Sequence, residues 1–260
     1  MSHSELDIDR LKSSLAGGLI GRRIVYEHTL GSTMDEARRL AEGVAEEGTV
    51  VIAEEQTKGR GRFDRTWHSP VGENLIFSVV LRPTQWQLNY VNMAATLAVA
   101  QTSTDATGTP ASIKWPNDVR IGGRKVCGIL IETSIVNADI KYAVVGIGFN
   151  VNFDISSIPE IANTATSLYR ETGRRWDRTD VLGRLLGYMD GYYAFVRSGK
   201  SITSDWSSRM DTLGQDIRVK WGEQVMEGKA VEVDDTGNLV LERHDGSRFT
   251  VYAGEVTLRT

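Results

Sequence analysis

The 260-residue sequence predicts an α+β fold, in which a mixed or antiparallel sheet packs against helices and is followed by a small SH3-like β-barrel. Three observations support this prediction. Strand patterns in the middle of the chain are joined by short turns, which indicates hairpins rather than helical crossovers. Other segments carry apolar residues at helical spacing. After Gly214 the pattern changes to four or five short strands, so we expect a larger domain at 1–213 and the barrel at 214–260.

The segment between two predicted strands, at 50–53 and 75–81, is the most informative part of the chain. It contains Gly59, Arg60, Gly61, Arg62, Arg65 and Trp67. Glycines at 59 and 61 permit positive φ angles and leave N–H groups exposed, and arginine side chains bind phosphate or carboxylate oxygens in pairs. We therefore predict an anion-binding loop that two rigid strands hold at its ends.

Two helices are predicted beside these strands. Thr33 and Glu36 have the spacing of a capping box, and apolar residues then recur at helical spacing as far as Val44. We therefore expect Ser32 and Thr33 at a helix N-terminus, where N–H groups and hydroxyls are available to a polar ligand. A second helix is predicted at 88–103, and its apolar character on most sides indicates burial against the sheet.

The remaining elements alternate between hairpins and helices. Strands are predicted at 112–115, 119–121, 125–133 and 142–151, and helices at 180–196 and 202–210. Pro116-Asn117-Asp118 forms the first turn, and Gly122-Gly123 is a two-residue hairpin signal.

Composition and charge exclude several classes of protein. The net charge of -4 and the pI near 5.7 argue against a dedicated nucleic-acid binder, which would be basic. A single cysteine, Cys127, excludes an intramolecular disulfide and suits a reducing compartment. The N-terminus is charged where a signal peptide would be apolar, and no apolar run approaches the roughly 18 residues of a membrane span. We expect a cytoplasmic protein that binds neither nucleic acid nor membranes.

The predicted anion-binding loop at 59–70 is called the arginine-rich loop below, and several polar residues are expected to converge on it. Lys114, Asn117 and Asp118 lie at a strand end and turn, and Lys125 begins the next strand, where it could reach the same side as Lys114. Taken singly, each of these residues is also typical of a solvated surface or of turn chemistry. The residue types alone therefore leave open whether they form a site.

The order of the motifs resembles that of biotin protein ligases. The motifs are Gly31-Ser32-Thr33, then Q-x-x-G-R-G-R-x-x-R-x-W-x-S-P from Gln56 to Pro70, K-W-P-N-D from Lys114 to Asp118, K-x-x-G-I-L-x-E from Lys125 to Glu132, and G-x-G-x-N from Gly146 to Asn150. They are spread over most of residues 24–153, and the compact C-terminus extends the resemblance to almost the full chain. Several motifs in one order are far more specific than any one of them.

The resemblance implies a fold and a two-step reaction. The fold is the biotin–lipoate ligase fold, which is similar to that of class II aminoacyl-tRNA synthetases, with the catalytic biotin- and ATP-binding domain at 1–213. Biotin and ATP first give biotinyl-5′-AMP and pyrophosphate. The biotinyl group then passes to a lysine on the biotin carboxyl carrier protein domain of a carboxylase.

The resemblance also implies roles for individual residues. The catalytic candidates are Lys125, Arg62 and Asp118. The biotin-binding candidates are Ser32, Thr33, Gln56, Gly59, Arg60, Arg62, Lys125 and Gly128. The ATP-binding candidates are Arg60, Arg62, Arg65, Trp67, Asn117, Lys125, Asn150 and Arg259, with Mg²⁺ on the ATP phosphates and unknown metal ligands. Asp118 could accept a hydrogen bond from the ureido ring of biotin or help deprotonate the incoming lysine, and both roles stay open.

The sequence departs from the family pattern at two places. Asp64 stands where many members have glycine, so we expect the unliganded loop to be partly disordered, to become ordered with the adenylate, and to pair Asp64 with an arginine. Only about twenty residues precede the catalytic region, too few for the helix-turn-helix domain of the family's repressor members. We therefore expect a short form that does not bind an operator.

Two other functions remain open at this level. A lipoate protein ligase would have a related fold and related chemistry. A non-catalytic module could instead use the arginine-rich loop to bind anions or nucleic acid, with an affinity that falls steeply as salt rises.

Overall fold

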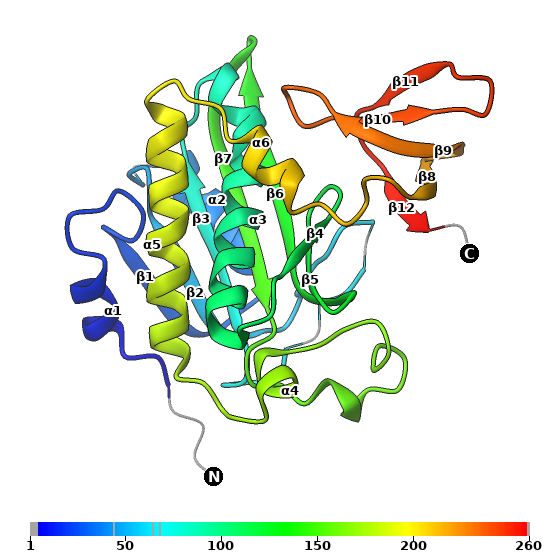
Figure 1. Cartoon of the computed structure of the whole chain (residues 1–260). Coiled ribbons are helices and arrows are strands. Elements are labelled where there is room, and N and C mark those ends of the chain that lie inside the picture. The colour runs from blue at the N-terminus through cyan, green and yellow to red at the C-terminus, as the bar shows by residue number, and fades with distance from the viewer. Residues whose placement is uncertain (1–4, 44, 64, 68, 259–260) are drawn as a thin grey trace.

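The computed structural model describes residues 5–43, 45–63, 65–67 and 69–258, and its larger part is built on a seven-stranded sheet (Figure 1). The strand order is β1-β2-β3-β7-β6-β5-β4. The strands are β1 (Ile24–Leu30), β2 (Val50–Gln56), β3 (Leu75–Leu81), β4 (Ser112–Lys114), β5 (Asp118–Ile121), β6 (Arg124–Val136) and β7 (Asp139–Phe149). Strands β1 and β2 are parallel and the other neighbours are antiparallel. The predicted mixed sheet is confirmed.

Helices cover both faces of this sheet (Figure 1). They are α1 (Ile8–Ser14), α2 (Thr33–Glu42), α3 (Gln85–Thr107), α4 (Leu168–Thr172), α5 (Arg178–Arg197) and α6 (Thr203–Ser208), with a 3₁₀ turn at Ile155–Ser157. Within the described residues, none of these helices combines the length and apolar character that crossing a membrane requires.

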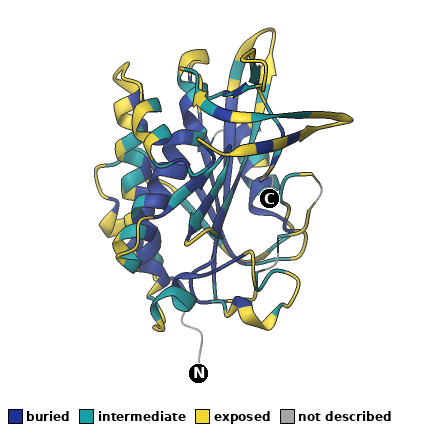
Figure 2. Cartoon of the chain, turned by 45° about the vertical axis from the view of Figure 1, so that its right-hand side comes forward, coloured by how far each residue is buried: buried dark blue, intermediate teal, exposed yellow. Residues whose placement is uncertain are grey.

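Alternating side chains of the strands supply two cores, one on each face of the sheet. On β2, Val50 and Ile52 pack in the larger core with α3 and α5, whereas Val51 packs in the smaller core under α2. Figure 2 shows that the strands of this sheet are largely buried and that the outward sides of the helices are exposed. Helix α3 lies in the middle of the larger core and extends beyond the predicted 88–103, because Thr84 and Gln87 form a capping box before it.

Helix α2 begins where the sequence indicates, but the predicted capping box is wrong. Ser32 is the N-cap, and neither it nor Thr33 caps the helix through a side chain. The Thr33 hydroxyl instead bonds to Gln56 and Ser78, and the Glu36 carboxylate accepts two hydrogen bonds from Arg39. Both members of the expected capping pair are therefore engaged elsewhere.

The C-terminal strands form a second sheet, which confirms the predicted β-rich C-terminal unit. The strands β8 (Asp216–Trp221), β9 (Gln224–Val233), β10 (Leu239–Glu242), β11 (Arg248–Val251) and β12 (Glu255–Leu258) lie in the antiparallel order β11-β10-β9-β8-β12. This sheet lies beside β4 and β5 (Figure 1), and the Trp115 indole donates a hydrogen bond of 2.9 Å to the carbonyl of Gly237. The exact division between 213 and 214 stays a prediction.

Candidate active site

A cavity of about 470 Å³ lies where the arginine-rich loop, the β4–β5 hairpin, strands β6 and β7 and the start of β12 meet. Most of the sequence-predicted site residues line it: Ser32, Thr33, Gln56, Arg60, Arg62, Arg65, Trp67, Asn117, Asp118, Lys125, Gly128 and Asn150. Among the described residues, six cationic side chains and only two carboxylates form its wall. This excess of positive charge suits an anionic ligand.

The arginine-rich loop folds back on itself between β2 and β3. The Gly61 N–H donates to the Arg65 carbonyl at 2.7 Å, and the Trp67 N–H donates to the Gly59 carbonyl at 3.1 Å. Gly59 and Gly61 do not adopt the positive φ angles that glycine permits, and the left-handed residue of this turn is Phe63, with φ of 56°. Gly59 is needed for another reason, because a Cβ there would lie 2.7 Å from the Trp67 carbonyl oxygen.

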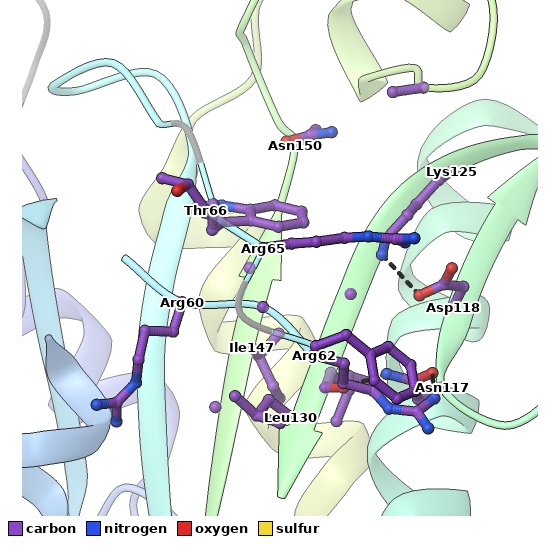
Figure 3. Close-up of a pocket in the computed structure, with 18 of the residues that line it drawn as sticks. Arg60, Arg62, Arg65, Thr66, Asn117, Asp118, Lys125, Leu130, Ile147 and Asn150 are labelled. Atoms are coloured by element: carbon purple, nitrogen blue, oxygen red, sulfur yellow. Dashed lines mark hydrogen bonds and ion pairs between the residues drawn. The ribbon is translucent and has the colours of Figure 1, made fainter. Parts of the chain in front are cut away.

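Lys125 and Asp118 face each other across neighbouring strands (Figure 3). The Lys125 Nζ lies 2.7 Å from Asp118 Oδ1, and both side chains are partly buried. The Lys125 backbone is fixed independently of this pair, because its N–H donates to the Thr164 carbonyl and its carbonyl accepts from the Thr166 N–H, both at 2.8 Å. Asp118 therefore holds the ammonium group at the cavity wall.

Arg62 joins the loop to the second sheet. Its Nη1 donates to Asn117 Oδ1 at 2.9 Å, and its Nη2 donates to the Gly254 carbonyl at 3.0 Å. Burial lowers the pKa of the Arg62 guanidinium, whereas the negative charges of Asp118 and Glu255 raise it. A partly buried guanidinium with only partial charge compensation attracts a further anion.

Arg60 and Arg65 pair with carboxylates at the edge of the cavity. Arg60 lies 2.8 Å from Asp35 and 3.4 Å from Glu132, and Figure 3 shows it directed away from Lys125. Arg65 pairs with Glu255. Exposed ion pairs of this kind contribute little to stability, so a bound anion can replace these carboxylates at small cost.

Glycines on β6 and β7 form a floor against which Trp67 packs. A Cβ at Gly148 would lie 2.4 Å from the Trp67 ring, and a Cβ at Gly128 would lie 2.9 Å from Lys125 Nζ. The indole Nε1 is buried and has no hydrogen-bond partner among the described residues. Only residues without side chains leave room for the ring here, and its N–H is available to an acceptor of a ligand.

A cluster of buried polar groups lies at the N-terminus of α2. The backbone N–H and the hydroxyl of Thr33 donate to Gln56 Oε1 at 2.7 and 3.0 Å. Ser32 is buried beside them, and the Thr33 hydroxyl also shares a hydrogen bond with Ser78. This end of the cavity offers neighbouring donors and acceptors rather than charge.

Asn150 is more tightly held than the sequence indicates. Its amide donates to the Thr166 carbonyl at 3.0 Å and accepts from Asn74 Nδ2 at 3.3 Å, so these contacts fix its orientation at the cavity wall. Two sequence predictions, the ATP contact of Arg259 and the pairing of Asp64, fall on residues outside the described part of the chain.

Lys114 lines the cavity, as its expected convergence on the loop predicts, whereas two further charged lining residues, Arg120 and Glu255, were not indicated by the sequence. Strand alternation could have placed Arg120, because it stands opposite Ser112 and two residues after Asp118 on the hairpin. No local signal indicates Glu255, which reaches the cavity from the second sheet.

Comparisons with known proteins agree with this geometry. Residues 27–150 match the Biotin/lipoate A/B protein ligase family, and residues 212–259 match the Biotin protein ligase C terminal domain. The chain is 34% identical to the bifunctional ligase/repressor BirA of Bacillus subtilis, with 98% of this chain and 79% of that protein covered. It is 33% identical to a biotin–[acetyl-CoA-carboxylase] ligase of Mycobacterium tuberculosis, with 96% of this chain and 95% of that protein covered.

A solved structure extends the likeness to three dimensions. The biotin protein ligase of Aquifex aeolicus in complex with biotin and ATP superposes with a TM-score of 0.76 at 33% identity, covering 92% of this chain and 99% of that one. The chain therefore belongs to the biotin/lipoate A/B protein ligase family, and within it to the biotin protein ligases.

Proposed function

We propose that this chain activates biotin with ATP to form biotinyl-5′-AMP and then transfers the biotinyl group to a lysine of a biotin carboxyl carrier protein domain. The observation that carries the proposal is one cavity with a polar end at Thr33 and Gln56, a glycine floor, and a cationic wall at Arg62 and Lys125. The likeness to the Aquifex aeolicus biotin- and ATP-bound enzyme supports it.

The proposed placement of biotin follows the polarity of the cavity. The ureido ring pairs its donors and acceptors with Ser32, Thr33 and Gln56 at the α2 end. The valeryl chain crosses the glycine floor near Gly128 toward Lys125. The biotin carboxylate then meets an ammonium group that is already fixed at the wall.

The proposed placement of ATP uses the loop and the hairpin. Trp67 stacks on the adenine, and Asn150 and Asn117 read its polar edge or contact phosphate oxygens. Arg62 and Lys125 surround the α-phosphate. Arg60 and Arg65 exchange their carboxylate partners for phosphate oxygens, because the exposed pairs that hold them are weak.

In the first step, a carboxylate oxygen of biotin forms a bond to the α-phosphorus, and the bond from that phosphorus to the bridging oxygen breaks to release pyrophosphate. Two anionic groups must approach each other, so the barrier is largely electrostatic. Lys125 and Arg62 lower it, because both charges are held in place before the substrates meet. No reorganisation is then needed during the reaction.

In the second step, the amine of the carrier lysine forms a bond to the acyl carbon, and the acyl–phosphate bond breaks to release AMP. The amine must lose a proton to become nucleophilic. Asp118 is a carboxylate that lines the cavity beside Lys125. It is a candidate to accept that proton, or its role is limited to holding the Lys125 ammonium group. Lys125 stabilises the AMP leaving group.

Mg²⁺ is a proposal that rests on the chemistry of ATP. Among the described residues, no group of three His, Cys, Asp or Glu side chains is placed to hold a metal ion. Among the described residues that line the cavity, Asp118 and Glu255 are the only carboxylates, so Mg²⁺ would be held chiefly by phosphate oxygens. When bound, Mg²⁺ would neutralise charge on the phosphates.

Incubation with MgATP, a carrier domain and either biotin or lipoate separates the two ligase functions. Biotin is expected to increase the intact mass of the carrier by one biotinyl group, because the polar α2 end matches the ureido ring, which lipoate lacks. A carrier with lysine replaced by arginine at the accepting position serves as the control. Preferential transfer of lipoate would contradict the proposal.

A further inference from the structure

Two buried asparagines face each other at the ends of β3 and β7. Leu75 on β3 pairs with Phe149 on β7 in antiparallel register, so Asn74 and Asn150 stand opposite each other one residue further along. Asn150 lines the cavity, whereas Asn74 does not. Asn74 can therefore influence a ligand only through its neighbours, and Asn150 is one of them.

Backbone groups fix which way both side-chain amides point. The Asn74 side chain accepts a hydrogen bond of 2.9 Å from the Val151 N–H, so the accepting atom must be its oxygen. The Asn150 side chain donates at 3.0 Å to the Thr166 carbonyl, so the donating atom must be its nitrogen. The remaining contact, 3.3 Å from Asn74 Nδ2 to Asn150 Oδ1, then joins a donor to an acceptor. A rotated Asn150 amide would instead place two NH₂ groups together and its oxygen against the Thr166 carbonyl.

The backbones of both asparagines are held as well. The Asn74 carbonyl accepts a hydrogen bond of 3.1 Å from Arg178, whose guanidinium is buried and paired with Glu54. The Asn150 N–H donates to the Val126 carbonyl at 2.9 Å. Because neither backbone is free to move away, a rotated Asn150 amide would leave buried polar groups unpaired.

The fixed amide of Asn150 determines which base edge it can bind. An NH₂ group has two hydrogens and an amide oxygen has two lone pairs, so each of these atoms keeps one position for a ligand. Adenine offers an N–H donor at N6 beside a ring-nitrogen acceptor, which matches an acceptor beside a donor. Hypoxanthine and guanine reverse this order at the same edge, with an acceptor at O6 beside an N–H donor at N1. An amide that rotates freely could pair with either order, whereas a fixed amide pairs with one.

We propose that Asn74 is a positioning residue that selects adenine over hypoxanthine and guanine by fixing the orientation of the Asn150 amide. This role rests on the proposed function, and within it on the contact between Asn150 and the polar edge of the adenine of ATP. A site with fixed donors and acceptors rejects a ligand of the reversed pattern, because polar groups of the site are then left unpaired.

Asn74→Asp tests this role. Aspartate keeps an oxygen for the Val151 N–H but replaces the donor toward Asn150 by a second acceptor. Inosine triphosphate is the matched probe, since it carries hypoxanthine in place of adenine. The ratio of kcat/KM for ATP to kcat/KM for inosine triphosphate is expected to fall roughly tenfold, as the loss of one buried hydrogen bond predicts. Asn74→Ala adds no buried charge, so it serves also if Asn74→Asp does not fold, and it is expected to lower the ratio in the same direction.

Asn152→Asp is the matched control. Asn152 is also buried, and its side chain likewise accepts from a backbone N–H and donates to another polar group, here the N–H and carbonyl of Trp176 at 2.8 and 2.9 Å. Asn152 does not line the cavity, so this variant should lose stability and keep the wild-type ratio. In an Asn150→Ala background, Asn74→Asp is expected to leave the ratio unchanged, because the group through which Asn74 acts is missing.

Calorimetric binding of ATP and of inosine triphosphate without biotin needs no turnover, so it separates failure of this role from failure of the proposed function. A wild-type preference for ATP that the Asn74 variants reduce supports the role even if the protein forms no biotinyl-5′-AMP. An unchanged preference in both Asn74 variants would overturn it. An equal fall in Asn152→Asp, or a fall that persists in the Asn150→Ala background, would overturn it as well.

Discussion

Replacing Lys125 by alanine is expected to slow the formation of biotinyl-5′-AMP by about a hundredfold, which is the usual cost of losing one preorganised charge contact in a transition state. The Lys125 ammonium lies at the cavity wall, 2.7 Å from Asp118, and would face both anionic groups of the first step. The fold is expected to survive, because the hydrogen bonds to Thr164 and Thr166 come from the Lys125 backbone.

Biotin-dependent pyrophosphate release in a single turnover measures this effect. Lys141→Ala is the matched control, since Lys141 is exposed on β7 and lies 3.7 Å from Asp139, away from the cavity. Its rate should equal that of the wild type. A rate for Lys125→Ala within a few-fold of the wild type would remove this lysine from the mechanism.

Replacing Arg178 by methionine is expected to lower the free energy of unfolding by about 3 to 5 kcal/mol. The Arg178 side chain is 4% exposed and its partner Glu54 is 1% exposed, and they are joined by hydrogen bonds of 2.7 and 3.1 Å. Arg178 also donates to the Asn74 carbonyl at 3.1 Å. The substitution leaves the Glu54 carboxylate buried without its cation, and desolvation of that charge carries the cost.

Urea-induced unfolding measures the loss, and a second substitution identifies its cause. Glu54→Met combined with Arg178→Met should recover a large part of the lost stability, because no buried charge remains. Arg39→Met is the matched control, since its pair with Glu36 is exposed and should contribute less than about 1 kcal/mol. If the double variant were less stable than Arg178→Met by a further similar amount, unpaired charge would not be the cause.

The elements that the sequence predicts well are those with strong local signals. Gly122 and Gly123 both adopt positive φ angles, at 56° and 78°, as a two-residue hairpin turn requires. Strand β1 was not predicted from the sequence. It is an edge strand whose side chains are only half-buried or exposed, so its sequence lacks the apolar pattern of a buried strand. The capping box at Thr33 was wrong because Gln56 and Ser78 bind its hydroxyl from other strands.

The candidate site could also be predicted only in part from the sequence. The order of the motifs indicated that the loop, the β4–β5 hairpin and Lys125 belong to one site, and in the structure they line one cavity. The sequence could not indicate which carboxylates hold the arginines, because Arg60 pairs with Asp35 and Arg65 with Glu255, the latter 190 positions away. Such pairs depend on the packing of the two sheets, for which adjacent residues carry no signal.

A crystal structure with a non-hydrolysable sulfamoyl analogue of biotinyl-5′-AMP tests most directly whether this cavity unites biotin and the α-phosphate. We expect the ureido ring to bond to Thr33 and Gln56, the sulfamoyl linker to lie within hydrogen-bonding distance of Lys125 and Arg62, and the adenine to stack on Trp67. An analogue bound outside the cavity, or one whose linker lies remote from Lys125 and Arg62, would contradict the account.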